Sequence, residues 1–146
     1  METVTLGDAS TSVTTVDALV GSGQTLTVSA TTLTGTNALT WDGSAETNGS
    51  FNITGSSQAD TITGGAGADT VTAGSGDDTI SSGNDADTII LGTNLTSSDT
   101  IDGGAGTDEL RFTDSGSATS DLDGVTNVET VTLGDASTSV TTVDAL

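Results

Sequence analysis

A nine-residue pattern of glycine and aspartate is the feature that most constrains the fold of this chain. The segments read GSSQADTIT from Gly55, GGAGADTVT from Gly64, AGSGDDTIS from Ala73 and SGNDADTII from Ser82, then the longer LGTNLTSSDTID and GGAGTDELR from Gly103. Glycine permits positive φ, so each glycine-rich stretch predicts a tight turn with exposed carbonyl groups. A turn followed by a short strand, repeated in phase, predicts coils that stack on one another.

The aspartates and the apolar residues of this array keep a common phase. Each aspartate ends its turn, and two positions later one apolar side chain is expected to point inward. The aspartates are Asp60, Asp69, Asp78, Asp87, Asp99 and Asp108; the apolar residues are Ile62, Val71, Ile80, Ile89, Ile101 and Leu110, with Ile53 one step earlier. The spacing is that of one nonapeptide except between Asp87 and Asp99, where the longer segment intervenes.

The charge of the chain limits its partners. It has 21 acidic residues against one basic residue, Arg111, for a formal net charge of −20. Nucleic acid and anionic membrane surfaces are excluded as partners, because nothing could neutralise their phosphates. A chain this acidic either stays expanded by self-repulsion or recruits cations. Without a cation, the alternative interpretation is an acidic disordered segment.

The spacing of the turns predicts where a cation would bind. Calcium prefers six to eight hard oxygen ligands, which carboxylates and backbone carbonyls supply. One turn cannot provide that number, whereas two turns stacked about 4.8 Å apart can. If two nonapeptides form one coil, each turn stacks on the turn two nonapeptides along the chain, which pairs Asp60 with Asp78 and Asp69 with Asp87. Carboxylates at this spacing repel each other unless a cation lies between them.

The segments GGAGADTVT and GGAGTDELR resemble the GGxGxDxUx repeat of the RTX (repeats-in-toxin) family, in which U is a large apolar residue. The resemblance implies an all-β fold, a right-handed parallel β-solenoid (β-roll) with Ca²⁺ between successive turns. It also implies type I secretion to the extracellular space or the bacterial cell surface. Two segments flank the array, ALTWDGSAETNGSFNITG and LDGVTNVETVTLGDAS. They resemble the linker segments of bacterial surface-layer and giant cell-surface RTX proteins.

The resemblance also implies a set of metal ligands. These are the carboxylates of Asp60, Asp69, Asp78, Asp87 and Asp108, with Asp77 and Asp85 as further candidates, and the carbonyls around Gly65, Gly67, Gly74, Gly76, Gly83, Gly104 and Gly106. We expect two or three calcium ions, clustered at 64–90, with Asp69 and Asp87 as the best pair.

Three departures from the repeat put parts of this set in doubt. Ser56 and Gln58 stand where the first turn would have glycines, so that turn is uncertain. Asp85 replaces the second turn glycine of the fourth segment, where it either adds a ligand or distorts the turn. The 91–102 segment lacks glycines before Asp99, so we expect no complete site there.

The chain also contains a long exact duplication. Residues 2–19 recur identically as residues 129–146, an offset of 127 given by the difference between positions 129 and 2. Either the parent protein has tandem repeats of this length or matching ends were introduced by design, and we favour tandem repeats. We interpret 1–146 as a single solenoid unit. It has irregular strand-rich coils over 1–54, the nonapeptide array over 55–112, and a connector with the start of the next repeat over 113–146.

These features together predict a structural function. No His, Cys, Lys or Tyr is present to act as base or nucleophile, so we expect no enzyme. No apolar run approaches the length of a membrane span. We expect a calcium-stabilised repeat of a secreted surface layer, filament or adhesin stalk that associates head to tail with identical repeats. One alternative is a calcium-dependent folding and secretion module of a secreted RTX enzyme. Another is an ice- or ligand-binding adhesin domain, which the threonine pairs of 61–81 suggest.

Overall fold

A computed structural model describes residues 2–113 and 122–134 of the chain, and these residues form strands, turns and no helix. The all-β class expected from the sequence is therefore confirmed. No helix in this part of the chain could cross a membrane. The strands are β1 (Glu2–Thr5), β2 (Thr11–Thr14), β3 (Thr25–Ser29), β4 (Leu39–Asp42), β5 (Ser50–Thr54), β6 (Thr61–Gly65), β7 (Thr70–Thr72), β8 (Thr79–Gly83), β9 (Thr88–Gly92), β10 (Thr100–Asp102), β11 (Glu109–Phe112), β12 (Val125–Thr126) and β13 (Thr130–Leu133).

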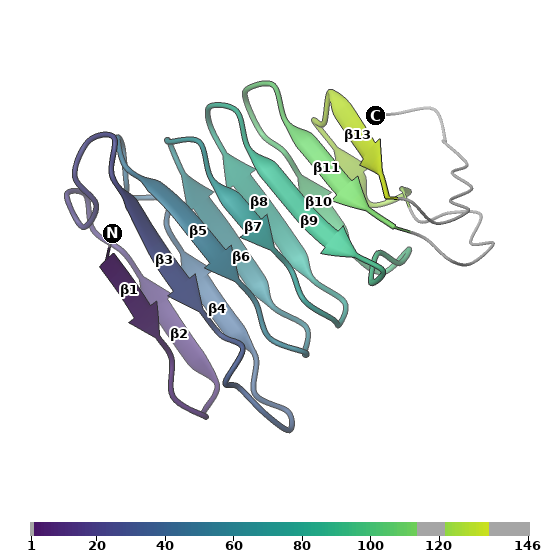
Figure 1. The fold of residues 1–146 in the computed structure, drawn as a ribbon, viewed down its shortest axis with the longest axis horizontal. Helices are drawn as coiled ribbons and strands as arrows, with labels where there is room; N and C mark the ends of the chain where they lie inside the picture. Colours follow the sequence, from purple (N-terminus) through teal and green to yellow (C-terminus); the bar gives the residue numbers. More distant parts are fainter. Residues whose placement is uncertain (1, 114–121, 135–146) are drawn as a thin grey trace.

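The strands alternate between two parallel sheets (Figure 1). The odd-numbered strands form one sheet in the order β1-β3-β5-β7-β9-β11-β13, and the even-numbered strands form the other in the order β2-β4-β6-β8-β10-β12. Each strand pairs with the strand two places along the chain, so two strands and two turns make one coil. The molecule is a β-solenoid of about six coils, as the nonapeptide spacing predicted.

Two ladders of apolar side chains fill the space between the sheets. In the seven-stranded sheet the register aligns Val4, Val28, Ile53, Val71, Ile89, Leu110 and Val131. In the six-stranded sheet it aligns Val13, Trp41, Ile62, Ile80, Ile101 and Val125. All six apolar residues expected from the array are buried, with at most 1% of their surface exposed. The core is therefore continuous along the solenoid axis, because each rung packs on the rung of the next coil.

The coils before the array belong to the same two sheets and carry the aromatic part of the core. Trp41 and Phe51 are each 1% exposed, and their rings meet edge to face with centroids 5.3 Å apart. Both lie on the strands that precede β6 and β7, directly beside the first coil of the array. This bulky pair fills the core of the less regular coils that precede the array.

Turn glycines allow the coils to approach closely. Gly83 has a φ of 115°, and a Cβ at this position would lie 2.1 Å from the carbonyl oxygen of Gly65 in the preceding coil. Gly92 also has positive φ, 58°, but a Cβ there would meet no atom within 4 Å. Gly83 is required both by its backbone conformation and by the short distance between coils. Gly92 is required by its backbone conformation alone.

The pair Gly83 and Gly92 tests the close approach between coils. Gly92→Ala is expected to cost about 1–2 kcal/mol of unfolding free energy, the strain of a left-handed residue. Gly83→Ala is expected to cost about 1–3 kcal/mol more, because its methyl group would force the two turns apart. Urea unfolding of both variants measures the difference. Equal losses would show that the stacking distance does not constrain this turn.

Candidate metal site

Six aspartates occupy equivalent positions at the ends of the turns, and all are buried. Their exposed fractions are 0–2%, which is unusual for charged side chains. They are Asp60, Asp69, Asp78, Asp87, Asp99 and Asp108. Each precedes the first residue of a strand, so the carboxylate turns inward where the backbone enters the sheet.

On one side of the solenoid, three of these carboxylates join four successive coils. Asp78 Oδ1 accepts a hydrogen bond of 2.8 Å from the backbone N–H of Asp60, and Asp99 Oδ1 accepts one of 2.8 Å from the N–H of Asp78. Asp60 Oδ1 accepts the N–H of Leu39 in the coil before, at 2.7 Å. Each of the three aspartates thus binds the backbone of the preceding coil. Asp60 and Asp78 also donate their own N–H to the next aspartate, whereas the Asp99 N–H donates to the Thr96 carbonyl at 3.2 Å.

The opposite side repeats this arrangement. Asp69 Oδ1 accepts the N–H of Phe51 at 2.7 Å, Asp87 Oδ1 that of Asp69 at 2.7 Å, and Asp108 Oδ1 that of Asp87 at 2.8 Å. Glu129 continues the series by accepting the Asp108 N–H at 2.8 Å. The predicted stacking of turns two nonapeptides apart is confirmed for Asp60 with Asp78 and for Asp69 with Asp87. Across the longer segment the stacked aspartates are 21 residues apart.

The second carboxylate oxygen distinguishes two kinds of turn, which the turns of Asp60, Asp69, Asp87 and Asp108 represent. In the first kind, which we name capped turns, this oxygen accepts an N–H from its own turn. Ser56 N–H donates to Asp60 Oδ2 at 2.6 Å, and Gly65 N–H donates to Asp69 Oδ2 at 2.8 Å. Both oxygens of these aspartates are therefore bound to backbone donors, one in the preceding coil and one in the same turn.

In the second kind, which we name open turns, the oxygen lacks a backbone donor. Asp87 Oδ2 and Asp108 Oδ2 are buried and accept no N–H from their own turns. The Ser82 hydroxyl lies near Asp87 and favours its charged form, but its hydrogen bond of 2.8 Å goes to the Gly103 carbonyl. In both turns the glycine at the capping position has positive φ, 115° at Gly83 and 91° at Gly104. A buried carboxylate oxygen without a donor is costly, so a ligand for it is expected. The two open turns stack directly on each other, since Asp87 N–H binds Asp108.

Burial and repulsion between carboxylates disfavour the charged form of four of the six aspartates, Asp69, Asp78, Asp87 and Asp108. Burial raises the pKa of Asp69 to about 6, that of Asp78 to about 6 and that of Asp87 to about 7. The neighbouring carboxylates of Asp69 and Asp108 add to the raised pKa of Asp87. The pKa of Asp108 is also raised, mainly by burial. A bound cation would offset this cost by neutralising stacked like charges.

The donor set at the open turns fits calcium. No three acidic side chains converge within residues 2–113 and 122–134, so carboxylates alone could not complete a coordination shell there. The remaining ligands would be turn carbonyls, and the Gly83 carbonyl faces the next coil, where it accepts the N–H of Ala105 at 2.8 Å. Two carboxylate oxygens with several carbonyls form the all-oxygen set that calcium prefers.

Comparison with known proteins agrees with this geometry. A family model for the RTX calcium-binding nonapeptide repeat matches four copies, over residues 54–89 and 96–112. The chain carries RTX calcium-binding nonapeptide repeats. No curated protein and no solved structure matches the chain. The matched ranges coincide with the stacked aspartate turns, including both open turns.

The matched ranges include one aspartate, Asp99, that was not among the ligands expected from the sequence. Asp99, in the segment without turn glycines, takes the same buried position as the other aspartates and accepts the N–H of Thr96 at 2.7 Å as well. The sequence indicates this position, because Asp99 precedes the apolar Ile101 by two residues, the same spacing as in the other segments. Ser56 does not break the first RTX turn, because its N–H and hydroxyl both donate to Asp60.

The other expected ligands are two aspartates and the remaining turn glycines. Asp77 and Asp85 are exposed, and Asp85 takes a left-handed φ of 67°, so it substitutes for a turn glycine without breaking the turn. The remaining turn glycines pack against the backbone of the preceding coil, where a Cβ would lie 1.9–3.1 Å from a carbonyl oxygen or other backbone atom. These glycines are Gly65, Gly67, Gly74, Gly76, Gly104 and Gly106. Whether their carbonyls bind calcium stays a prediction.

The raised pKa values generate a prediction about pH. A carboxyl group whose pKa is higher in the folded state binds protons more readily when folded, so its protonation stabilises the fold. In a chelator, the melting temperature should therefore fall as the pH rises from about 4, the unfolded value, through about 7, the folded value for Asp87. Thermal melts monitored by circular dichroism measure this trend. A melting temperature that rises over the same range would contradict the assigned pKa shifts.

Proposed function

We propose that this chain is a calcium-stabilised structural repeat of a secreted surface or fibre-forming protein. The observation that carries the proposal is the stack of buried aspartates, in which two successive turns present carboxylate oxygens without donors. The RTX match supports calcium as the ion, and RTX repeat proteins are typically secreted. The first ion would bind Asp87 and Asp108. A capped turn could bind an ion only after the hydrogen bond from its own N–H to the aspartate is broken.

Calcium binding would control folding. In the absence of calcium, a net charge of −20 and the desolvation of six aspartates oppose the compact state. An ion held between two coils joins residues 21 positions apart, so its binding energy contributes directly to the stability of the stack. Such a chain would stay unfolded during export from a calcium-poor compartment and would become rigid outside the cell.

A structural role also agrees with the open form of the solenoid, onto which a further coil of the same or of another chain can stack. In the described residues β1 and β13 are the edge strands of one sheet, and β2 and β12 are those of the other. Edge strands present unpaired backbone groups, which favour pairing with another chain. Head-to-tail contact of this kind does not close on itself and propagates as a filament. We propose no catalytic role, because each inward-facing acid is accounted for as a bond to the neighbouring coil.

The threonine rows give weaker support to an ice-binding alternative. Thr61, Thr79 and Thr100 align on the outer face of the six-stranded sheet. The next outward row, however, aligns Thr63 and Ser81 with Asp102. A charged residue interrupts the flat, uniform threonine surface that such binding would need, so we favour ordinary β-propensity for these positions.

Removal of calcium tests the proposed folding control. In calcium the far-ultraviolet circular dichroism spectrum should show the strand signal of the solenoid, and excess EDTA at neutral pH should abolish most of it. Restoring calcium should bring the signal back, because the chain has no disulfide that could interfere. Magnesium at the same concentration is the control, since its strict octahedral geometry suits this site poorly. An unchanged strand signal in EDTA would contradict the proposal.

Substitution of one open-turn aspartate tests the site. Asp87→Asn keeps an oxygen that can accept the Asp69 N–H but removes the charge. It should weaken calcium binding by about tenfold or more. Asp123→Asn, an exposed aspartate outside the nonapeptide array, is the matched control and should leave the affinity unchanged. Isothermal titration calorimetry measures both, and equal affinities would place the ion elsewhere.

A further inference from the structure

A buried glutamate outside the nonapeptide array closes the turn between β4 and β5. The Glu46 side chain is fully buried. Its Oε2 accepts the N–H of Val20 in the preceding coil at 2.9 Å. Its Oε1 accepts the N–H groups of Asn48 and Gly49, in its own turn, at 3.3 and 3.2 Å. Three backbone donors thus surround one carboxylate, and a buried charge that is bonded in this way needs no cation.

Glu46 lies in the same column of turns as Asp69, Asp87 and Asp108, because each of these turns joins an even-numbered strand to the next odd-numbered strand. Its turn stacks on that of Asp69, where the Ala66 N–H donates to the Glu46 carbonyl at 3.0 Å. Glu46 makes both bonds of a capped turn, as Asp69 does. Asp87 and Asp108 make only the bond to the preceding coil. The need for a cation therefore increases along this column.

The coils before the array contain a large apolar core and little buried charge. Residues 2–54 bury one carboxylate, that of Glu46, whereas residues 55–112 bury six aspartates. The two largest side chains of the core, Trp41 and Phe51, also belong to the coils before the array. The buried side-chain atoms without a partner in these coils are uncharged, the hydroxyls of Thr15 and Thr27 and the indole N–H of Trp41. Leaving such neutral groups unpaired costs less than burying an unpaired charge.

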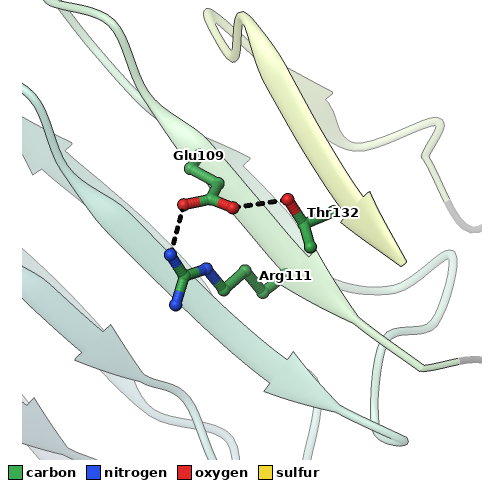
Figure 2. A network of polar contacts seen from close by, with 3 residues as sticks. All are labelled: Glu109, Arg111 and Thr132. Atoms are coloured by element: carbon green, nitrogen blue, oxygen red, sulfur yellow. Dashed lines mark hydrogen bonds and ion pairs between the residues drawn. The ribbon is translucent and has the colours of Figure 1, made fainter. Parts of the chain in front are cut away.

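Surface charge differs between the two regions in the same direction. Residues 2–54 contain five acids and no base, and residues 55–112 contain ten acids and one base, so their net charges are −5 and −9. The single base, Arg111, binds Glu109 at 2.6 Å, and Glu109 also accepts the Thr132 hydroxyl (Figure 2). The other nine acids of the array have no cationic side chain to offset them. Repulsion between like charges therefore opposes folding of the array more than folding of the coils before it.

The first turns of the array bind to backbone donors of the preceding coils. Asp60 Oδ1 accepts the N–H of Leu39 on β4, and Asp69 Oδ1 accepts the N–H of Phe51 on β5, both at 2.7 Å. The first two strands of the array, β6 and β7, pair with the same two strands, β4 and β5. Both columns of aspartates and both sheets of the array therefore start on β4 and β5.

We propose that residues 2–54, which we name the template coils, fold without calcium and direct the assembly of the calcium-dependent coils of the array. Glu46 holds the template coils together by joining the turn of Val20 to the turn that precedes β5. Calcium then adds coils in order from β6 onward. This inference rests on the proposed calcium control of folding and specifies which part of the chain that control governs.

A template of this kind would fix the register of the array. The nonapeptides resemble one another closely, so an array that began to fold at any turn could pair its strands in a shifted register. The donors of Leu39 and Phe51 define which turn is the first on each side. In a parent protein with tandem repeats, each repeat would contain its own template coils, and the register would be set once in every repeat.

Trp41 is the only tryptophan, so its fluorescence reports on the template coils separately from the array. In excess EDTA the far-ultraviolet circular dichroism spectrum should lose most of its strand signal, while the emission of Trp41 stays at short wavelength. The acrylamide quenching constant of Trp41 should rise by less than about twofold, because unfolding of the array leaves a separate cooperative unit intact. Urea added to the EDTA sample should then expose Trp41.

Glu46→Gln tests whether the buried glutamate holds the template coils together. The substitution keeps the length of the side chain but removes the charge and turns one acceptor oxygen into a donor. In EDTA this variant should show the Trp41 quenching of the urea-unfolded chain. In calcium it should fold at a calcium concentration roughly tenfold higher, because the binding energy must then also fold the template coils. Glu2→Gln, at an exposed glutamate of β1, is the matched control and should behave as the unmodified chain.

The outcomes separate this inference from the proposed function. Loss of the strand signal together with exposure of Trp41 in EDTA would overturn the template but keep calcium control of folding. Retention of both signals in EDTA would overturn the proposed function and the inference with it. A Glu46→Gln chain that keeps Trp41 buried in EDTA would overturn the role of Glu46. A Glu46→Gln chain that does not fold even in calcium, while Glu2→Gln does, would support the template, because the array would then be unable to assemble without it.

Discussion

The structure depends on one repeated bond, the hydrogen bond from the backbone N–H of one aspartate to the carboxylate of the aspartate in the next coil. It forms on both sides of the solenoid, for example from Asp60 to Asp78 and from Asp69 to Asp87. Because the bond is charge-assisted and buried, it fixes the distance and register between coils more firmly than the short strands could alone. The apolar ladders, the strand pairing and the close approach of the turn glycines all require that register.

The stacking that this bond maintains creates an electrostatic cost that makes a cation useful. The bond itself favours the charged carboxylate, but burial and the neighbouring carboxylates raise the pKa of Asp87 to about 7. Capped turns satisfy both carboxylate oxygens with backbone N–H groups, whereas the open turns of Asp87 and Asp108 do not. In the turns of Asp60 and Asp69 the residue four positions before the aspartate caps it. Before Asp87 and Asp108 that residue, Gly83 or Gly104, has positive φ, as Gly74 has before Asp78.

Much of the fold could be predicted because the solenoid is nearly one-dimensional. Each coil contacts only its neighbours, so the phase of the aspartates and of residues such as Ile62 and Ile80 determined which side chains point inward and which turns stack. The coils at 2–54 were harder to predict, since they lack the nonapeptide spacing. There Glu46 takes a role like that of the aspartates, with Oε2 accepting the Val20 N–H at 2.9 Å and Oε1 accepting the Gly49 N–H at 3.2 Å.

The sequence by itself determined the all-β solenoid, the apolar ladders, the pairing of turns two nonapeptides apart and the RTX repeats, because a strict period leaves few ways to stack. Only the tertiary structure decided which carboxylates are open. Asp69 and Asp87 hold the same position in the repeat, yet the Gly65 N–H caps the first and no backbone N–H caps Oδ2 of the second. It also decided that Asp99 belongs to the buried series and that the duplicated segments lie at opposite edges of one sheet. These outcomes depend on backbone dihedral angles and on contacts between coils, which residue spacing does not encode.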